Sequence, residues 1–290
     1  MKRAAIIVAS VMAALVIAFL VFVWFMQWVH AGSVTGDDGV AEGYAQHVDT
    51  GGQLEAQYQA DGPHEVELHH EGEFTVAAPV GEGSWPVVVM VNGTRTPASD
   101  YQPILEHLAS WGFVVVGDEE PHAGDGEAAL RTLASVAELE PRADVGQVGL
   151  YGHSQGGVGA FNAAADSDAV DAVYVASPAS TKIAKRNGWP YRVDEVDVPV
   201  FVMAGDGRQD RMMVSPWSGV HEAFDSTSGP GVLARRIGAD HPDVLEFGDA
   251  YATAWLRWQL QGDEVAATAF SGADPEIANN PHWTEVTIRN

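Results

Sequence analysis

The 290-residue chain carries 40 acidic residues against 15 lysines and arginines, which gives a formal net charge of −25. A balance so acidic excludes a general nucleic-acid binder, because phosphates need a basic face to neutralise them. Hydrophobic residues make up 46% and charged residues 19%, so the chain can bury a sizeable core. Cysteine is absent, which excludes disulfides, thiolate metal sites and a cysteine nucleophile.

The N-terminus has the pattern of a membrane anchor or a signal peptide. Two basic residues precede an apolar run over residues 4–29. As a helix this run would reach roughly 39 Å, enough to cross a hydrocarbon core of about 30 Å. The alternative is cleavage by a signal peptidase near Ala31. We expect residues 1–31 to lie outside the folded domain, and the remaining chain to be extracytoplasmic, either anchored or secreted.

Residues 32–63 show little hydrophobic pattern and contain acidic but no basic side chains. Such a composition predicts an acidic, flexible stalk. The remaining residues, 64–290, are expected to form one catalytic domain.

From residue 64 onward, strand and helix patterns alternate along the chain. Two short strands at residues 66–68 and 73–78 come first. Several later strands are uniformly apolar, as expected when helices cover both faces of a sheet. We therefore predict an α/β fold with a mostly parallel central sheet and helices on both faces. The later strands are expected at residues 86–91, 113–116, 145–151, 170–175, 199–204 and 233–237, and the helices at residues 101–110, 126–139, 156–165 and 249–260.

The strongest chemical signal is the G-x-S-x-G motif at Gly152–Gly156. It follows a predicted strand and precedes a helix of small residues, the context in which this motif presents a nucleophile. A sharp strand-to-helix turn raises the serine hydroxyl above the sheet, and glycines avoid clashes beside it. The motif predicts Ser154 as the nucleophile, and the alternative is a tight structural turn.

A serine nucleophile needs a histidine base, which in this chain order follows the serine. Three histidines qualify. His241 lies in a polar loop directly after the strand at residues 233–237, where the sheet edge would present a base. His221 falls in a predicted helix and His282 in the irregular tail. We therefore expect His241 to be the base, against the alternative that it only caps the next helix.

The acid that orients the base should follow the strand at residues 199–204. Two aspartates do so, Asp206 and Asp210. Asp206 stands at the strand end, where Gly-Asp-Gly also makes an ordinary turn. Asp210 lies one loop further on. We favour Asp210 and leave Asp206 as the alternative.

Acyl transfer develops an oxyanion that backbone amides must meet. One donor should be the N–H of Gln155, the residue after the nucleophile. The second should come from the turn after the strand at residues 86–91, where the N–H of Thr94 is our candidate.

Together these segments resemble the α/β-hydrolase superfamily and, within it, exported bacterial dienelactone-hydrolase-like, lipase and cutinase-like serine esterases. The resemblance covers residues 64–287 and implies a Ser154–Asp210–His241 triad with Thr94 and Gln155 as oxyanion donors. The acid loop is longer than the common Gly-x-x-Asp form, and the C-terminal disulfide of many cutinase-like relatives is missing. The matching segments are Val91–Thr94, Tyr101–Phe113, Gly152–Gly157, Pro199–Asp210, His241 and Ala254–Gln259.

Trp189 and Tyr191 are candidates for substrate contact, as the rings of a short lid, although we favour the alternative that they pack a proline-containing loop. The segment between residues 175 and 199 is too short for a large cap domain. An open cleft would suit bulky, lipid or polymeric esters. The histidines outside the triad show no metal-ligand spacing, so we expect neither a metal nor a cofactor.

These observations predict an exported serine carboxylic ester hydrolase that works through an acyl-enzyme. Two alternatives remain open. A cell-envelope acyltransferase would use the same triad with an alcohol as acceptor, and a non-catalytic envelope-binding protein would keep the fold without serine reactivity. We expect an ester substrate, no nucleic-acid partner, membrane contact only through residues 4–29 if they are retained, and a monomer.

Overall fold

The computed structural model describes residues 12, 16–17, 19–21, 40, 43–120 and 122–290. Most of the predicted anchor or signal peptide, together with the cleavage position near Ala31, lies outside these residues. Within them, no helix is long and apolar enough to cross a membrane.

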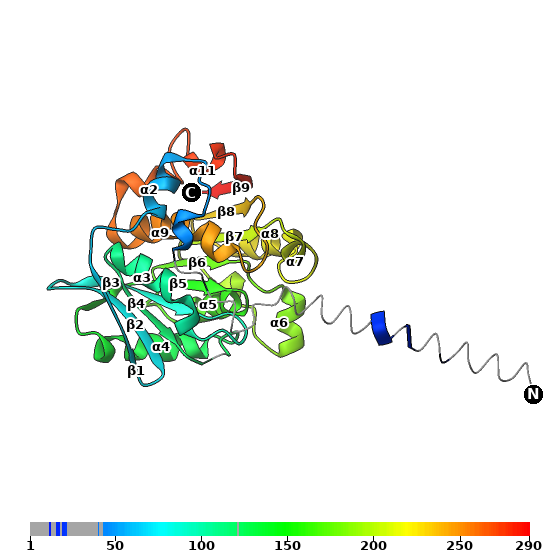
Figure 1. Ribbon diagram of the computed structural model, residues 1–290, viewed down its shortest axis with the longest axis horizontal. Helices are drawn as coiled ribbons and strands as arrows, with labels where there is room; N and C mark the ends of the chain where they lie inside the picture. Colours follow the sequence, from blue (N-terminus) through cyan, green and yellow to red (C-terminus); the bar gives the residue numbers. More distant parts are fainter. Residues whose placement is uncertain (1–11, 13–15, 18, 22–39, 41–42, 121) are drawn as a thin grey trace, which may run out of the picture.

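The described chain forms a nine-stranded sheet in the order β1-β2-β4-β3-β5-β6-β7-β8-β9 (Figure 1). The strands from β4 to β8 are parallel, whereas β1, β2 and β9 are antiparallel to their neighbours. The predicted α/β class with a mostly parallel sheet is thus confirmed. The strands are β1 (Val66–Glu71), β2 (Phe74–Pro79), β3 (Trp85–Val91), β4 (Val114–Asp118), β5 (Ala143–His153), β6 (Ala172–Ala176), β7 (Val200–Gly205), β8 (Gly231–Arg236) and β9 (Trp283–Arg289).

Helices cover both faces of the sheet. The side chains of α3 and α9 join one hydrophobic core, and those of α4, α5 and α8 join the other. Shorter helices fill the connections. The helices are η1 (Tyr44–Gln46), α2 (Gln53–Gln59), η2 (Ala98–Tyr101), α3 (Gln102–Ser110), α4 (Glu127–Leu139), α5 (Gln155–Asp166), α6 (Thr181–Asn187), η3 (Val193–Glu195), α7 (Arg208–Met212), α8 (Trp217–Ser226), α9 (Val244–Gln261), α10 (Glu264–Ala267) and α11 (Glu276–Asn279).

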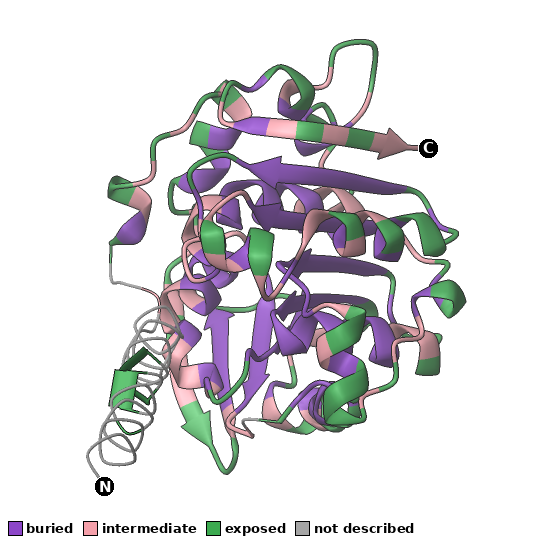
Figure 2. Cartoon of the chain, turned by 90° about the vertical axis from the view of Figure 1, so that its right-hand side faces the viewer, coloured by how far each residue is buried: buried purple, intermediate pink, exposed green. Residues whose placement is uncertain are grey.

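Strand β3 shows why the central strands are apolar throughout. Val87 and Val89 point into one core, while Val88 and Met90 point into the other, because successive side chains of a strand alternate between faces. All four are buried. Figure 2 shows the central strands in the colour of buried residues, whereas the edge strand at the C-terminus alternates between buried, intermediate and exposed positions.

That edge strand, β9, lies in the region that the sequence pattern left as an irregular tail. It pairs antiparallel with β8 and covers what would otherwise be the open edge of the sheet. Its half-buried alternation is much weaker than the apolar runs of the central strands, so its pairing depends on β8 rather than on its own sequence.

The predicted stalk over residues 32–63 is wrong for residues 43–63, which pack against the domain. Tyr44 and Tyr58 are buried in the core that contains α9. The carboxylate of Glu276 accepts hydrogen bonds from the backbone N–H groups of Leu54 (2.8 Å) and Glu55 (2.9 Å) in the first turn of α2. Figure 1 shows α2 beside α11, far from it in sequence. The folded domain therefore begins well before residue 64.

Candidate active site

Ser154 occupies the sharp turn between β5 and α5. Its backbone has φ 57° and ψ −118°, in the left-handed half of φ space that side chains other than glycine rarely adopt. The flanking glycines explain why the turn can form. A Cβ on Gly156 would lie 1.9 Å from the carbonyl oxygen of Val91, and one on Gly152 would lie 2.6 Å from the carbonyl oxygen of Gly156. Only glycine fits at both positions.

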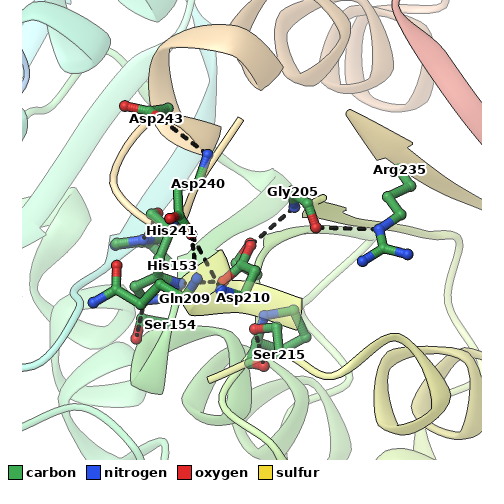
Figure 3. Close-up of polar contacts among 12 residues, drawn as sticks. His153, Ser154, Gly205, Gln209, Asp210, Ser215, Arg235, Asp240, His241 and Asp243 are labelled. Carbon is green, nitrogen blue, oxygen red and sulfur yellow. Dashed lines mark hydrogen bonds and ion pairs between the residues drawn. The ribbon is translucent and has the colours of Figure 1, made fainter. Parts of the chain in front are cut away.

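His241 bridges Ser154 and Asp210 (Figure 3). Its Nε2 lies 2.9 Å from the hydroxyl oxygen of Ser154, and its Nδ1 lies 2.6 Å from a carboxylate oxygen of Asp210. The three side chains follow the ends of β5, β7 and β8, which belong to the parallel part of the sheet, with β6 between β5 and β7. Ser154 is 8% exposed, His241 5% and Asp210 0%, so the hydrogen bonds are shielded from bulk water.

The carboxylate of Asp210 is held by three donors besides its position on α7. One oxygen faces His241, and the other accepts hydrogen bonds from the hydroxyl of Ser177 and from the backbone N–H of Gly205, the latter at 2.9 Å. Burial alone would raise the pKa of Asp210, but the charge of His241 and these hydrogen bonds lower it below its usual value. Asp210 therefore stays ionised beside the histidine.

The alternative acid, Asp206, has a different role in the structure. One of its carboxylate oxygens accepts a hydrogen bond from the backbone N–H of Gly238 at 2.7 Å. Asp206 thereby joins the loop after β7 to the turn after β8, while the carboxylate that contacts His241 belongs to Asp210.

Sequence reasoning missed Asp240, which ties the acid loop to the base loop. One carboxylate oxygen of Asp240 accepts hydrogen bonds from the backbone N–H groups of Gln209 (2.8 Å), Asp210 (3.2 Å) and His241 (2.9 Å) (Figure 3). A residue next to the histidine in sequence is poorly placed to approach its far ring nitrogen, and Asp240 makes no side-chain contact with the His241 ring. The structure gives it another task, which is to hold Asp210 and His241 at a fixed separation.

A second missed network runs through His153, the residue before the nucleophile. The backbone N–H of Gly93 donates to the Tyr101 hydroxyl (2.7 Å), which lies 3.1 Å from Nδ1 of His153. Nε2 of His153 lies 3.4 Å from the carbonyl oxygen of His241. A carbonyl can only accept, so Nε2 carries the proton and Nδ1 accepts from Tyr101. Burial, followed by the charge of His241, lowers the pKa of His153 to about 3, so this ring is neutral near pH 7.

The two expected oxyanion donors, Gln155 and Thr94, lie in the segments next to His153 and Gly93. Gln155 begins α5, where backbone N–H groups have no acceptor within the helix. Its side-chain amide donates to the carbonyl oxygen of Gly93 at 3.3 Å, which joins α5 to the turn after β3. Thr94 lies in that turn and is exposed. The two segments are thus neighbours, and the role of their N–H groups remains a prediction.

Comparison with known proteins finds a family match to residues 46–121, about the first third of the folded region. A family model described as Chlorophyllase matches residues 46–121. Chlorophyllase-1, chloroplastic, of Citrus sinensis is 32% identical over 102 residues, which is 30% of this chain and 30% of that protein. Chlorophyllase-2 of Arabidopsis thaliana is 29% identical over 103 residues, 31% of this chain and 32% of that protein. The match thus spans less than a third of the length of these curated relatives.

The chain has the α/β-hydrolase fold. The sheet order, the serine turn and the match to the chlorophyllase family, itself part of this superfamily, agree on that assignment. Residues 46–121 include the turn with Thr94 but none of Ser154, Asp210 and His241. The narrower resemblance to exported bacterial esterases remains a prediction.

Trp189 and Tyr191, the predicted substrate residues, pack beside α5 and α6. Trp189 is partly buried against a small cluster that contains Ala179, and its ring would meet a Cβ on Gly124 at 2.4 Å. Tyr191 makes an edge contact with the ring of Phe161, at 6.4 Å between centroids. Both rings therefore contribute to packing. Both rings pack against the cluster that contains Ala179, whose N–H donates to the Ser154 carbonyl oxygen at 2.9 Å.

Among the described residues, no group of three or more His, Cys, Asp or Glu side chains is arranged to hold a metal ion. The polar groups around Ser154 bond to one another and to the backbone, which is the arrangement of an acid–base site. The chemistry that these groups support is proton transfer at a serine hydroxyl.

Proposed function

We propose that the chain is a serine carboxylic ester hydrolase with Ser154 as nucleophile, His241 as general base and Asp210 as the acid that orients the base. The observation that carries the proposal is His241, whose two ring nitrogens lie 2.9 Å from the Ser154 hydroxyl and 2.6 Å from the Asp210 carboxylate. A histidine bridging a strained serine and an ionised, buried aspartate has the geometry of an activated nucleophile.

The reaction follows from these contacts. Nε2 of His241 takes the proton of Ser154 as the oxygen attacks the ester carbonyl, and the imidazolium is stabilised by Asp210. The alcohol leaves with the proton from His241, and the acyl group stays on Ser154. Water then attacks the acyl-enzyme and its proton passes to His241, which returns it to the Ser154 oxygen as the acyl–oxygen bond breaks and the acid is released. The N–H groups of Gln155 and Thr94 are our candidates for stabilising the oxyanion in both steps.

The substrate class is a carboxylic ester. The names of the curated relatives suggest a chlorophyll ester as one candidate, but the matched segment does not contain the triad. Trp189 borders the cluster next to Ser154, and we assign it and Tyr191 to contact with the bulky part of the ester. No cofactor enters these steps. The extracytoplasmic location and the monomeric state rest on the sequence alone.

The test is hydrolysis of p-nitrophenyl butyrate by the full chain, together with labelling by a fluorophosphonate. Ser154→Ala should abolish both, and the control Ser135→Ala, a partly exposed residue of α4 whose hydroxyl donates to the carbonyl oxygen of Arg131, should keep both. Labelling of Ser154 with negligible turnover, but with transfer to an added alcohol, would favour the acyltransferase. A folded protein with neither labelling nor turnover would overturn the enzymatic proposal and favour a binding protein.

A further inference from the structure

Most basic side chains of this acidic protein are already paired. Of the 15 lysines and arginines, Lys2 and Arg3 lie outside the described residues. Of the remainder, Arg236 and Arg289 donate to backbone carbonyl oxygens, and Arg208 also has a partner. The ion pairs with acidic residues are Arg131 with Asp118, Arg142 with Glu67 and Glu140, Arg192 with Asp166 and Glu195, Arg235 with Glu285, and Arg257 with Asp263.

Five other basic residues are exposed and make no ion pair within the described chain. We call them the basic rim. They belong to three short segments, namely the turn after β3, helix α6 and helix α7. The members are Arg95, Lys182, Lys185, Arg186 and Arg211.

All three segments adjoin the candidate triad. The N–H of Ala179, two residues before α6, donates to the Ser154 carbonyl oxygen at 2.9 Å. Lys182 lies three residues further on, a chain length of at most about 11 Å. The N–H of Ser180 donates to the carbonyl oxygen of Val214 at 2.9 Å, which joins the start of α6 to the segment after α7. Figure 1 shows α6 and α7 at the same end of the molecule.

The other two members lie in segments that also adjoin the triad. Arg211 follows Asp210 on α7. Arg95 has a left-handed backbone, φ 61°, in the turn whose Gly93 carbonyl accepts from the side chain of Gln155. The basic rim therefore lies in three segments that adjoin the triad, namely the turn after β3, α6 and α7.

Within the part of the chain that the structure describes, no carboxylate forms an ion pair with a residue of the basic rim. Residues 177–190 contain three basic and no acidic side chains. The carboxylates of Asp206 and Asp240, in the loops after β7 and β8, accept hydrogen bonds from backbone N–H groups. At about 0.1 M salt the Debye length is ~10 Å, so the acidic excess on distant surfaces is screened more than charges at the rim itself.

We propose that the basic rim selects esters that carry a second, anionic group, a carboxylate or a phosphate, several atoms from the scissile carbonyl. This inference rests on the proposed esterase function. Lys and Arg side chains bind such oxyanions, and a local positive field raises their rate of encounter. A small anionic substrate fits better than an anionic membrane, because a protein of net charge −25 is repelled by a surface larger than the rim.

The experiment compares two esters that differ only in charge. The anionic probe is mono-p-nitrophenyl glutarate, and the neutral probe is p-nitrophenyl glutaramate, whose terminal carboxylate is replaced by an amide. We expect kcat/KM of the wild type to favour the anionic ester about tenfold at low ionic strength, within the range of electrostatic steering. The ratio should fall towards one in 0.5 M NaCl, where charges are screened within about 4–5 Å.

The test variant combines Lys182→Gln, Lys185→Gln and Arg186→Gln, none of which touches the triad. It should lower the anionic-to-neutral ratio about tenfold while keeping turnover of the neutral ester. The matched control makes the same change in net charge far from the rim, on exposed glutamines of α2 and of the start of β5, and should keep the wild-type ratio. Its substitutions are Gln53→Glu, Gln57→Glu and Gln147→Glu.

Several outcomes separate this inference from the proposed function. A wild-type ratio near one, or a ratio that the test variant leaves unchanged, would overturn the rim proposal and leave the esterase standing. If neither ester is hydrolysed, calorimetry with Ser154→Ala compares monomethyl glutarate with methyl glutaramate, and equal binding overturns the rim proposal. Stronger sedimentation with phosphatidylglycerol than with phosphatidylcholine vesicles, lost in the test variant, would reassign the rim to a membrane surface.

Discussion

At the scale of single residues, His241 can be oriented by one carboxylate only. Asp210 is in contact with its Nδ1, while Asp206, four residues earlier, bonds to the backbone of the next loop. Asp210 is completely buried and ionised, so its charge acts on the imidazolium through a medium that screens it far less than water. The choice between the two aspartates has a direct kinetic consequence.

Asp210→Asn should lower kcat by about 10³–10⁴-fold, because an amide can stabilise the wrong histidine tautomer and carries no charge. Asp206→Asn is the matched control and should stay near the wild-type rate, since its partner is a backbone N–H. Both variants should be measured with p-nitrophenyl butyrate after circular dichroism has shown that they fold. The assignment is wrong if the two variants exchange these phenotypes.

The Tyr101 hydroxyl connects His153 to the turn after β3, which carries Thr94, the proposed oxyanion donor. Tyr101→Phe leaves the buried N–H of Gly93 without its acceptor, a cost of about 1–3 kcal/mol that the turn relieves by moving. We expect kcat to fall by roughly tenfold or more, since a displaced oxyanion donor acts on the transition state. The control is Tyr174→Phe, which removes a longer 3.4 Å bond to the carbonyl oxygen of Gly248. Equal kcat in the two variants would contradict a positioning role for Tyr101.

His153 should make the protein sensitive to acid. Its pKa falls from 6.5 to about 3 on folding, so the unfolded chain binds more protons between these values. Stability then rises with pH across this window and is lost on acidification, by at most about 1.4 kcal/mol per pH unit. Urea unfolding at pH 7 and pH 5 should show a smaller loss for His153→Gln than for the wild type. Identical losses would mean that His153 binds its proton as readily in the folded protein as in the unfolded chain, which would contradict a lowered pKa.

At the scale of elements, the segment before residue 64 belongs to the core. The hydroxyl of Tyr58 donates to Asp263 at 2.9 Å, and the carboxylate of Glu55 accepts from the indole N–H of Trp283 (2.8 Å) and the amide of Asn280 (2.8 Å). These bonds join α2 to the end of α9, to α11 and to β9. Removing α2 would therefore expose apolar surface and leave buried polar groups without partners.

A chain that begins at residue 64 should be much less stable than one that begins at residue 40. Losing the buried side chains of Tyr44 and Tyr58 alone should lower the free energy of unfolding by several kcal/mol, since each large buried side chain contributes about 3–5 kcal/mol. For a domain of this size, that corresponds to a melting temperature lower by about 10 °C or more. Thermal unfolding followed by circular dichroism compares the two chains. Equal melting temperatures would restore the flexible-stalk interpretation.

At the scale of the whole molecule, charge repulsion is the feature to test. A net charge of −25 opposes compaction, and salt screens this repulsion. The melting temperature should therefore rise between 0.02 and 0.5 M NaCl by several degrees, about 1–2 kcal/mol. The double variant Glu71→Gln with Glu73→Gln removes two exposed negative charges at the β1–β2 turn. It should therefore show a smaller rise in melting temperature with salt. A melting temperature that falls with salt would show that the ion pairs contribute more than the repulsion.

The sequence by itself determined the features that depend on local geometry. Apolar runs predicted the central strands, because a strand covered on both faces has no polar side. Glycines around Ser154 predicted the serine turn, because only glycine tolerates the close backbone contacts there. The chain order then pointed to His241 and to a pair of candidate acids.

Only the tertiary structure decided which groups meet across long stretches of chain. The choice of Asp210 over Asp206, the role of Asp240 and the link from Tyr101 to His153 each depend on loops from different strands. The docking of α2 and the pairing of β9 likewise join the two ends of the chain. Such contacts produce no periodic pattern in the sequence. Which of several polar side chains makes the contact depends on where its partner lies in the folded structure.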